Sequence, residues 1–327
     1  MTIPHFIHLR LHSEYSIVDG LVRIDDAIKA AASDQQPALA ITDLSNLFGM
    51  VKFYKSARGK GVKPVIGCDV WITNDDQRDK PSRLLLFVKN HTGYLQLCEL
   101  LSQSWLVNQH LGRAEIRPEW LAALPPGGLI ALSGAHFGDI GMALENGNLD
   151  GARRCAQHWA KVFPDHFYIE IQRANQANMA AQVRQSVALA AELGLPVVAT
   201  HPVQFIDASE FIAHEARTCI AEGEILANGR RVKRFNQDHY FKTQAEMQEL
   251  FADLPGALAN SVEIAKRCNL VLEPLLCATD RVQMQSSARL FPAKLCKTCV
   301  TSHAMCVAER PRRCVMAVAE PCVLCWL

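Results

Sequence analysis

Short apolar segments alternate with amphipathic ones along the first 273 residues. Seven segments have the length and apolar character of buried strands, namely residues 6–9, 38–41, 65–72, 84–88, 129–133, 167–171 and 196–200. Apolar side chains recur at helical spacing in the stretches around residues 24–31, 47–54, 97–101, 149–162, 176–193, 208–222, 244–252 and 256–268. Strands that alternate with helices over short links predict parallel β/α units.

Local residue choices support several of these boundaries. Gly194 follows the long helix at 176–193 and is typical of a helix end. Thr243 and Glu246 have the spacing of a capping box for the helix at 244–252. Seven strands, each leading to a helix or a helix-bearing loop, predict a closed (β/α)7 barrel, with a doubly wound open sheet as the structural alternative. No Gly-x-Gly-x-x-Gly follows the first strand, which argues against the dinucleotide-binding version of that sheet.

Residues that can bind metal gather after the predicted strands. In a β/α barrel, functional side chains lie at the C-terminal ends of the strands. Those positions hold His12, Asp19, Asp43, Asp69, His136, Glu170 and His201. Carboxylates mixed with imidazoles suit zinc, manganese or iron, and such ions could activate water against a phosphodiester. Taken alone, this set predicts a metallohydrolase.

Composition places the chain among globular proteins. Its 327 residues are 49% hydrophobic and 20% charged, enough for one large or two ordinary soluble domains. No run of about 18 uncharged apolar residues is present, so no membrane span is expected. The N-terminus lacks the basic region and apolar stretch of a secretory signal, and a cytoplasmic location is therefore expected.

The composition changes after residue 273. The last 54 residues hold seven Lys and Arg against three Asp and Glu, which leaves 27 basic and 30 acidic residues before them. A slightly acidic body is expected to bind DNA only weakly, if at all. Cys296-x-x-Cys299 and Cys322-x-x-Cys325 have zinc-ribbon spacing, but no glycine follows Gly256. We therefore interpret residues 274–327 as a Cys-rich, out-of-frame and disordered tail, with a zinc module as the alternative.

The segment from His8 to Gly20 carries a family resemblance. It resembles the first motif of the polymerase-and-histidinol-phosphatase (PHP) domain at the N-terminus of bacterial DNA polymerase III alpha subunits, usually His-Leu-His-x-His-Ser-x-Tyr-Ser-x-x-Asp-Gly. Further similar motifs are Ile41-Thr42-Asp43, Asn46-Leu47-Phe48-Gly49, Lys63-Pro64-Val65-Ile66-Gly67-Cys68, Gly93-Tyr94, Leu132-Ser133-Gly134, Pro196-Val197-Val198-Ala199-Thr200, Phe251-Ala252-Asp253-Leu254-Pro255 and Ala265-Lys266-Arg267-Cys268-Asn269. The resemblance covers residues 1–273, which we take as one PHP domain, and implies a distorted seven-stranded TIM-like barrel.

The chain departs from the ligand pattern that the resemblance implies. Histidines of the family fall at Arg10, Leu44 and Arg83, a glutamate falls at Asp69, and an Asn-Asp-x-His series falls at His201-Pro202-Val203-Gln204. Arginine is always charged and cannot bind a metal, so it repels a cation from the space it fills. We predict a vestigial metal site that retains His12, Asp19, Asp43, Asp69 and Glu170. Arg10 and Arg83 are expected to pair there with Asp19, Asp43 or Asp69, and a remnant zinc or manganese site is the alternative.

Other polar residues near the site have simpler interpretations. Glu170 fits equally a site carboxylate and a structural partner for an arginine. His8 is expected to be an interior histidine with a hydrogen bond, rather than a ligand. His136 and His201 are expected to be loop histidines, and Ser16 is expected to hydrogen-bond inside the first loop. No Gly-x-Ser-x-Gly elbow supports a serine nucleophile.

Two functions follow from the resemblance. An intact PHP site implies a metal-dependent 3′–5′ exonuclease, whereas an eroded site implies a scaffold that docks the separate proofreading (epsilon) subunit. We expect the scaffold, with no catalytic residue and no cofactor. Template-directed DNA synthesis with magnesium, and contacts with other holoenzyme subunits, would need palm, fingers and thumb regions that this sequence does not contain. The alternative is an active metal-dependent phosphoesterase, such as a histidinol phosphatase, or an exonuclease.

Overall fold

The computed structural model describes residues 4–174 and 179–272. The described residues up to Val271 belong to one compact unit. The predictions for the tail, including its disorder and its Cys-x-x-Cys pairs, concern residues outside the described ranges. The boundary at residue 273 and the out-of-frame interpretation therefore stay predictions.

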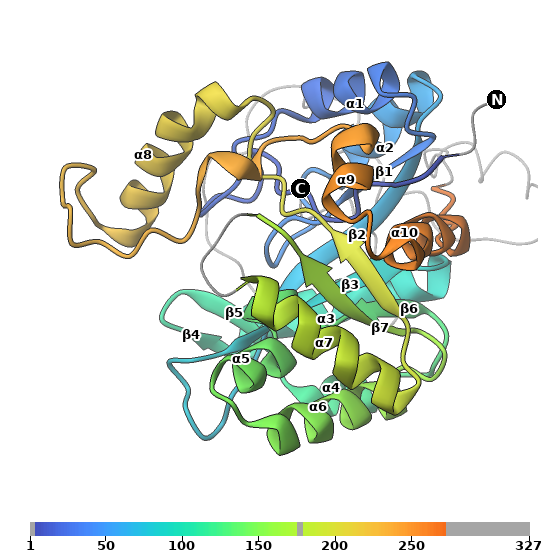
Figure 1. Ribbon diagram of the computed structural model, residues 1–327, viewed down its shortest axis with the longest axis vertical. Coiled ribbons are helices and arrows are strands. Elements are labelled where there is room, and N and C mark those ends of the chain that lie inside the picture. The colour runs from blue at the N-terminus through green and yellow to red at the C-terminus, as the bar shows by residue number, and fades with distance from the viewer. Residues whose placement is uncertain (1–3, 175–178, 273–327) are drawn as a thin grey trace, which may run out of the picture. The chain divides into compact units, whose positions relative to one another are not determined.

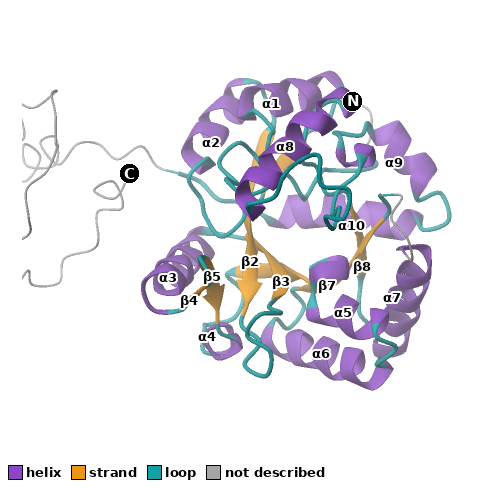
Figure 2. Ribbon diagram, turned by 90° about the vertical axis from the view of Figure 1, so that its left-hand side faces the viewer, coloured by secondary structure: helices purple, strands orange, loops and turns teal. Residues whose placement is uncertain are grey.

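The strands form a mixed sheet with helices around it (Figure 2). The strands are β1 (Ala38–Ile41), β2 (Lys63–Ile72), β3 (Ser82–Val88), β4 (Gln109–His110), β5 (Arg113–Ile116), β6 (Leu129–Leu132), β7 (Phe167–Gln172) and β8 (Val197–Thr200). Their order is β4-β5-β2-β3-β6-β7-β8, and β1 pairs with β2. Six of the seven predicted strands are confirmed within a few residues, and β4 and β5 are additional.

Strand β2 is long because its two halves have different partners. Its first half, from Lys63 to Ile66, pairs in parallel with β1, and residues from Gly67 to Ile72 pair antiparallel with β3. Strand β3 is also antiparallel to β6, whereas β6, β7 and β8 run parallel. The prediction of uniformly parallel β/α units is therefore wrong at β3. The polar link at 73–81 contains no helix, and without a helical crossover a strand returns as a hairpin.

The predicted opening strand at residues 6–9 is also wrong. The segment instead makes a few scattered backbone hydrogen bonds on each of two sides. Ala40 donates its N–H to the carbonyl of His8, and His12 donates its N–H to the carbonyl of Val203, each at 3.0 Å. Side-chain oxygens take other backbone donors, as where Ile7 N–H bonds Ser261 Oγ, which prevents a regular ladder. Residues 8–12 therefore lie between β1 and the chain that follows β8, and no strand ladder within the described residues joins those two sides.

The helices agree closely with the apolar periodicity. They are α1 (Ile24–Ser33), α2 (Met50–Gly59), α3 (His91–Val107), α4 (Pro118–Ala122), α5 (Asp139–Glu145), α6 (Leu149–Val162), α7 (Met179–Leu193), α8 (Phe211–Glu222), α9 (Gln244–Leu250) and α10 (Pro255–Arg267). Gly194 follows α7 with a φ of +66°, and Thr243 with Glu246 forms the expected capping box of α9. No helix in the described ranges has the length and apolar character to cross a membrane.

The core lies between the strands and α10. Leu9, Val65, Leu85 and Ile130 are buried in one cluster to which α10 contributes Ile264, among other residues. Helix α8 projects from the strands together with the loop that follows it (Figure 1). A different set of buried residues continues from the apolar cluster, and these side chains are charged. They form the site described next.

Candidate functional site

Five charged side chains meet inside the fold from four parts of the chain. Arg10 and His12 belong to the opening segment, Asp69 to β2, Arg83 to β3 and Glu170 to β7, and each is less than 9% exposed. Asp69 and Glu170 lie within their strands rather than at the ends, which corrects the expected placement. Arg83 lies near the start of β3, and it reaches the same region because β3 runs antiparallel to β2. We call these five residues, together with Asp19, the ion-pair cluster.

Arg10 is the central cation of the cluster. Its Nη1 donates to Asp69 Oδ2 at 2.5 Å, while Nε and Nη2 donate to the two oxygens of Glu170 at 2.9 and 3.0 Å. This is the two-pronged geometry that guanidinium and carboxylate groups favour. Burial disfavours the charged form, but Asp69 and Glu170 outweigh it and raise the pKa of Arg10 above its ordinary value.

Arg83 is the second cation, and aromatic rings hold it. Its Nη1 donates to Asp69 Oδ2 at 3.0 Å, and its Nη2 lies 3.7 Å from Asp19 Oδ2. The guanidinium also lies 4.3 Å from the ring centre of Trp71 and 5.2 Å from that of Phe137, within cation–π range. Sequence analysis missed both rings. Trp71 could have been found, since it lies two residues after Asp69 and so faces the same side of β2.

His12 adds a third positive charge. Its Nδ1 donates to Asp19 Oδ1 at 2.8 Å, and its Nε2 lies 3.3 Å from Asp69 Oδ2. Burial disfavours the imidazolium, but Asp19 and Asp69 outweigh it and raise the pKa of His12 to about 9. Burial likewise opposes ionisation of Asp19, yet His12 and Arg83 hold its pKa well below the ordinary range. Ser16 donates its hydroxyl to Asp19, as expected for a hydrogen bond inside the first loop.

Asp43 lies nearby but has different partners. Its Oδ1 accepts the backbone N–H of Ser13 at 2.6 Å, and its Oδ2 accepts the Ser13 hydroxyl at 2.8 Å. Burial raises the pKa of Asp43 to about 6, although the Ser13 donors oppose the shift. In the described residues neither arginine pairs with Asp43, so of the three expected aspartate partners only Asp69 and Asp19 are used.

Glu170 is surrounded by polar groups from β7 itself, from β8 and from the residue after β6. Its Oε1 accepts the Thr200 hydroxyl at 2.5 Å and the Gln172 side-chain amide at 3.1 Å. Its backbone N–H donates to Ser133 Oγ at 2.9 Å. Sequence analysis did not identify these three partners. In the structure, Glu170 is the partner of an arginine, one of its two expected roles.

The other expected ligand positions lie at the edge of the cluster or outside it. Leu44 is buried and its backbone pairs with that of Asp69, Pro202 is buried, and the side-chain nitrogen of Gln204 lies 3.4 Å from His12 Nδ1. His201 instead donates to the carbonyl of Tyr240 at 3.0 Å. Burial lowers the pKa of His136 to about 3, so that ring is neutral. His8 donates to the carbonyl of Lys242 at 2.7 Å, as expected for an interior histidine.

The family's metal ions do not fit these side chains. Guanidinium nitrogens already occupy Oδ2 of Asp69 and both oxygens of Glu170, although Oδ1 of Asp69 is buried without a hydrogen-bond partner. A divalent ion there would lie beside the fixed charges of Arg10 and Arg83 and would be repelled. Across residues 4–174 and 179–272, no three His, Cys, Asp or Glu side chains are grouped so as to hold a metal. The three cations instead face three carboxylates, and this pairing balances the buried charge.

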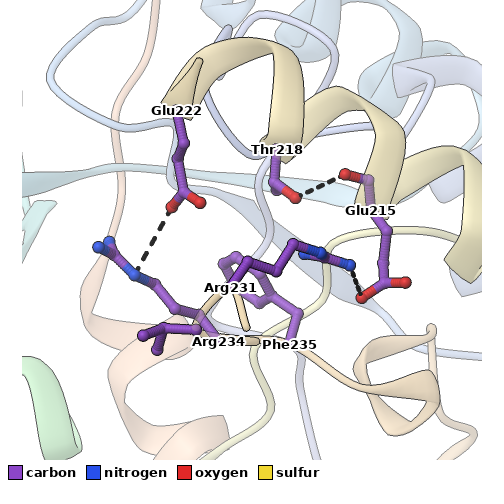
Figure 3. A pocket seen from close by; sticks show the side chains of 7 residues that line it. Glu215, Thr218, Glu222, Arg231, Arg234 and Phe235 are labelled. Carbon is purple, nitrogen blue, oxygen red and sulfur yellow. Dashed lines mark hydrogen bonds and ion pairs between the residues drawn. The ribbon is translucent and has the colours of Figure 1, made fainter. Parts of the chain in front are cut away.

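A polar pocket separate from the ion-pair cluster lies between α8 and residues 231–235 (Figure 3). Arg231 Nη2 donates to Glu215 Oε1 at 2.5 Å, and Arg234 Nε lies 3.6 Å from Glu222 Oε1. The Thr218 hydroxyl donates to the carbonyl of Glu215. These contacts attach the loop to α8, so we interpret the pocket as structural.

Comparison with known proteins finds a matching family model and several similar proteins. The PHP domain model matches residues 8–174. The chain is 51% identical over 272 residues to DNA polymerase III subunit alpha of Neisseria meningitidis serogroup B, covering 83% of this chain and 24% of that protein. The corresponding protein of Pseudomonas fluorescens is 49% identical over 265 residues, covering 81% and 22%, and that of Escherichia coli K12 is 42% identical over 272 residues, covering 83% and 23%.

The chain thus spans about a quarter of the length of these relatives. Among solved structures, an amidohydrolase from Chromobacterium violaceum is similar with 14% identity and a TM-score of 0.43, covering 61% of this chain and 87% of that one. The family model accounts for just over half of the residues, in the part that contains Arg10, Asp69 and Glu170. The chain therefore belongs to the PHP domain family.

Proposed function

We propose that this chain is the PHP part of a bacterial DNA polymerase III alpha subunit and that it acts as a scaffold without catalytic activity of its own. In this proposal, the ion-pair cluster takes the structural place of a metal centre. The whole polymerase would carry out DNA synthesis with magnesium held elsewhere. The similarity to three alpha subunits over more than four-fifths of the chain supports the assignment to DNA replication.

One observation carries the proposal of a scaffold. The guanidinium of Arg10 donates hydrogen bonds to Asp69 and to both oxygens of Glu170. The carboxylates that would bind a catalytic ion therefore already have a permanent cation as their partner. Unlike a metal, arginine offers no open coordination position at which water could be activated. The same contacts join the opening segment to β2 and β7, which is a purely structural role.

We further propose that the scaffold docks the proofreading exonuclease (epsilon) subunit in the cytoplasm. A domain that has lost its own metal chemistry would leave 3′-end editing to a separate protein. Mixing the full chain with the epsilon subunit of the same organism and analysing the mixture by size-exclusion chromatography tests this proposal. Co-elution is the expected result, and separate elution at micromolar concentrations of both proteins would contradict it.

The absence of catalysis has its own test. The full chain should hold no stoichiometric zinc or manganese by elemental analysis. It should also release no product from bis(p-nitrophenyl) phosphate or from a 3′-labelled oligonucleotide when these metals are added. Metal-dependent turnover would overturn the scaffold proposal in favour of a phosphoesterase or exonuclease.

A variant pair examines whether Arg10 is what excludes the metal. Arg10→His with Leu44→His restores imidazole at two positions where the family has ligands, and it frees oxygens of Asp69 and Glu170. Calorimetry should detect zinc or manganese binding in the double variant and none in the original chain. Leu44→His alone is the matched control, because Arg10 still pairs with both carboxylates. Equal binding by this control would mean that Arg10 does not block the site.

A further inference from the structure

The sequence contains two Asn-Gly pairs, and the structure holds them differently. Asn146-Gly147 lies in the turn between α5 and α6, and Asn228-Gly229 lies in the loop that follows α8 (Figure 1). All four residues are exposed. Asparagine is a labile residue, and a following glycine favours its breakdown, because no side chain hinders the backbone nitrogen that attacks the asparagine Cγ.

At the first pair, hydrogen bonds engage both reacting groups. Gly147 donates its N–H to the carbonyl of Leu144 at 3.0 Å and has a left-handed φ of +70°. The side-chain nitrogen of Asn146 donates to the carbonyl of Met142 at 2.8 Å, and Asn146 is also the C-cap of α5. Attack by the Gly147 nitrogen would therefore require the end of α5 to open first.

At the second pair, the attacking nitrogen has no partner and the side-chain carbonyl has a donor. No group in residues 4–174 and 179–272 accepts the N–H of Gly229, and no atom beyond its chain neighbours lies within 4 Å of the position that a Cβ would take there. The Oδ1 of Asn228 accepts the backbone N–H of Arg230 at 3.0 Å. This donor would stabilise the negative charge that develops on Oδ1 during attack. The Nδ2 of Asn228 donates to Glu224 Oε2 at 3.0 Å, which holds the amide in place.

We propose that Asn228 is a site of spontaneous modification, at which the folded chain converts this asparagine to aspartate and isoaspartate. The Gly229 nitrogen loses its proton to hydroxide and forms a bond to Asn228 Cγ. The Cγ–Nδ2 bond breaks, and Nδ2 takes a proton from water and leaves as ammonia, which closes a succinimide ring. Water then opens the ring at either of its two carbonyls, so the net reaction consumes one water and releases one ammonia. The inference rests on this loop alone and does not depend on the ion-pair cluster or on the proposed function.

The new carboxylate would change the contacts of the loop. It would face Glu224 where the amide now donates a hydrogen bond, and two negative charges at that separation repel each other. The segment between α8 and Arg231 would lose this attachment, while the pair of Arg231 with Glu215 would remain. Modified chains should therefore be cut faster than fresh chains by a protease that cleaves at Arg230.

Peptide mass mapping of the full chain during incubation at mildly alkaline pH tests the proposal, with Asn146 as the internal control. In the folded chain, Asn228 should convert at least about fivefold faster than Asn146, the factor expected when one hydrogen bond must first be broken at Gly147. In concentrated urea the two sites should convert at similar rates, because glycine follows both asparagines and the fold no longer distinguishes them.

Gly229→Ala supplies the matched variant. Its methyl group has open space in the fold, and Gly229 does not have a left-handed φ, so the variant should fold as the original chain does. The added methyl group should slow conversion of Asn228 and leave the rate at Asn146 unchanged. The proposal is overturned if the folded chain converts Asn146 as fast as Asn228, if the difference between the sites persists in urea, or if Gly229→Ala does not slow Asn228. None of these outcomes would alter the metal analysis or the activity assay.

Discussion

Arg10 shows how one buried residue can join two strands through ion pairs. It bonds carboxylates on β2 and β7 that lie 101 positions apart in the chain, at Asp69 and Glu170. Charges buried in this way are costly to leave without a partner, although a fully apolar replacement can be neutral. Substituting several cluster residues together should therefore destabilise the fold less than substituting one of them alone.

Arg10→Met should lower the free energy of unfolding by about 3–5 kcal/mol, because Asp69 and Glu170 would lose their principal buried cation. Adding Glu170→Gln should recover part of this loss, since the second substitution removes one unpaired negative charge. Urea denaturation of the two single variants and the double variant measures this coupling.

The matched control is Arg153→Met, which breaks the exposed pair with Glu192 and should leave the free energy of unfolding nearly unchanged. A double variant no more stable than Arg10→Met, or a control that loses as much, would contradict this account.

The site could be predicted from sequence only where the residues themselves carry the information. Arg10 and Arg83 could be singled out because the family resemblance implies a ligand at each position, and two of their three expected aspartate partners, Asp19 and Asp69, followed from charge. Thr200, Ser133 and Phe137 could not be found, because their contacts depend on how the segments at 133–137 and around 200 pack against Glu170 and Arg83. Their hydroxyl or aromatic side chains have no spacing that distinguishes them in the chain.

At the scale of elements, helices were predicted better than strand directions. Apolar periodicity gives the position of a buried strand such as Ser82–Val88, but it does not give the direction in which the strand runs. The link at 73–81 contained the missing information, because its nine residues, eight of them polar, have no helical periodicity and are too few for a typical parallel crossover. The opening segment was misassigned for another reason, because its apolar residues resemble a strand while side chains take several of its backbone bonds.

The capping box of α9 gives a prediction at this scale. Thr243 accepts the N–H of Glu246 through its hydroxyl, and the Glu246 carboxylate accepts the N–H of Thr243. Thr243→Ala should cost about 1 kcal/mol of unfolding free energy, because the first turn loses this acceptor. Thermal denaturation followed by circular dichroism measures the change.

Thr92→Ala is the control for the cap, since Thr92 is exposed in the first turn of α3 and Asn90 serves as the N-cap there. Its effect should stay within about 0.5 kcal/mol. Equal losses in the two variants would mean that the capping box contributes nothing specific.

At the scale of the whole molecule, buried titratable groups set the pH range of stability. Burial lowers the pKa of both His8 and His239 to about 4, so the folded state keeps these rings neutral. The unfolded chain binds protons near pH 6.5. The histidine contribution is therefore complete above pH 6.5 and is lost as the pH falls towards 4. His12 acts in the opposite sense, with a contribution complete below pH 6.5 that is lost as the pH rises through about 9.

Urea midpoints should therefore be highest near neutral pH. Between pH 7 and pH 5.5 the free energy of unfolding should fall on the order of 2 kcal/mol, because at least three histidines, His8, His136 and His239, stay neutral in the folded state and outweigh the opposite effect of His12. Asp43 partly offsets this fall, since its pKa is raised to about 6 and its contribution grows as the pH drops through that value. Asp43→Asn should remove the offset and make the acid loss steeper. A midpoint that does not change over this range would contradict the assignment of neutral histidines.

The contacts of the opening segment have a consequence for synthesis on the ribosome. His12 hydrogen-bonds Val203, and Ile7 hydrogen-bonds Ser261. The first residues of the chain therefore cannot make these contacts until nearly the whole domain has been synthesised. At about 5–20 residues per second, translation leaves this N-terminal stretch without those partners for roughly 10–50 s. Phe6, Ile7, Leu9 and Leu11 are all buried in the finished fold, yet they emerge first. A nascent chain that stalls before residue 203 therefore leaves these apolar side chains exposed, where chaperones can bind them.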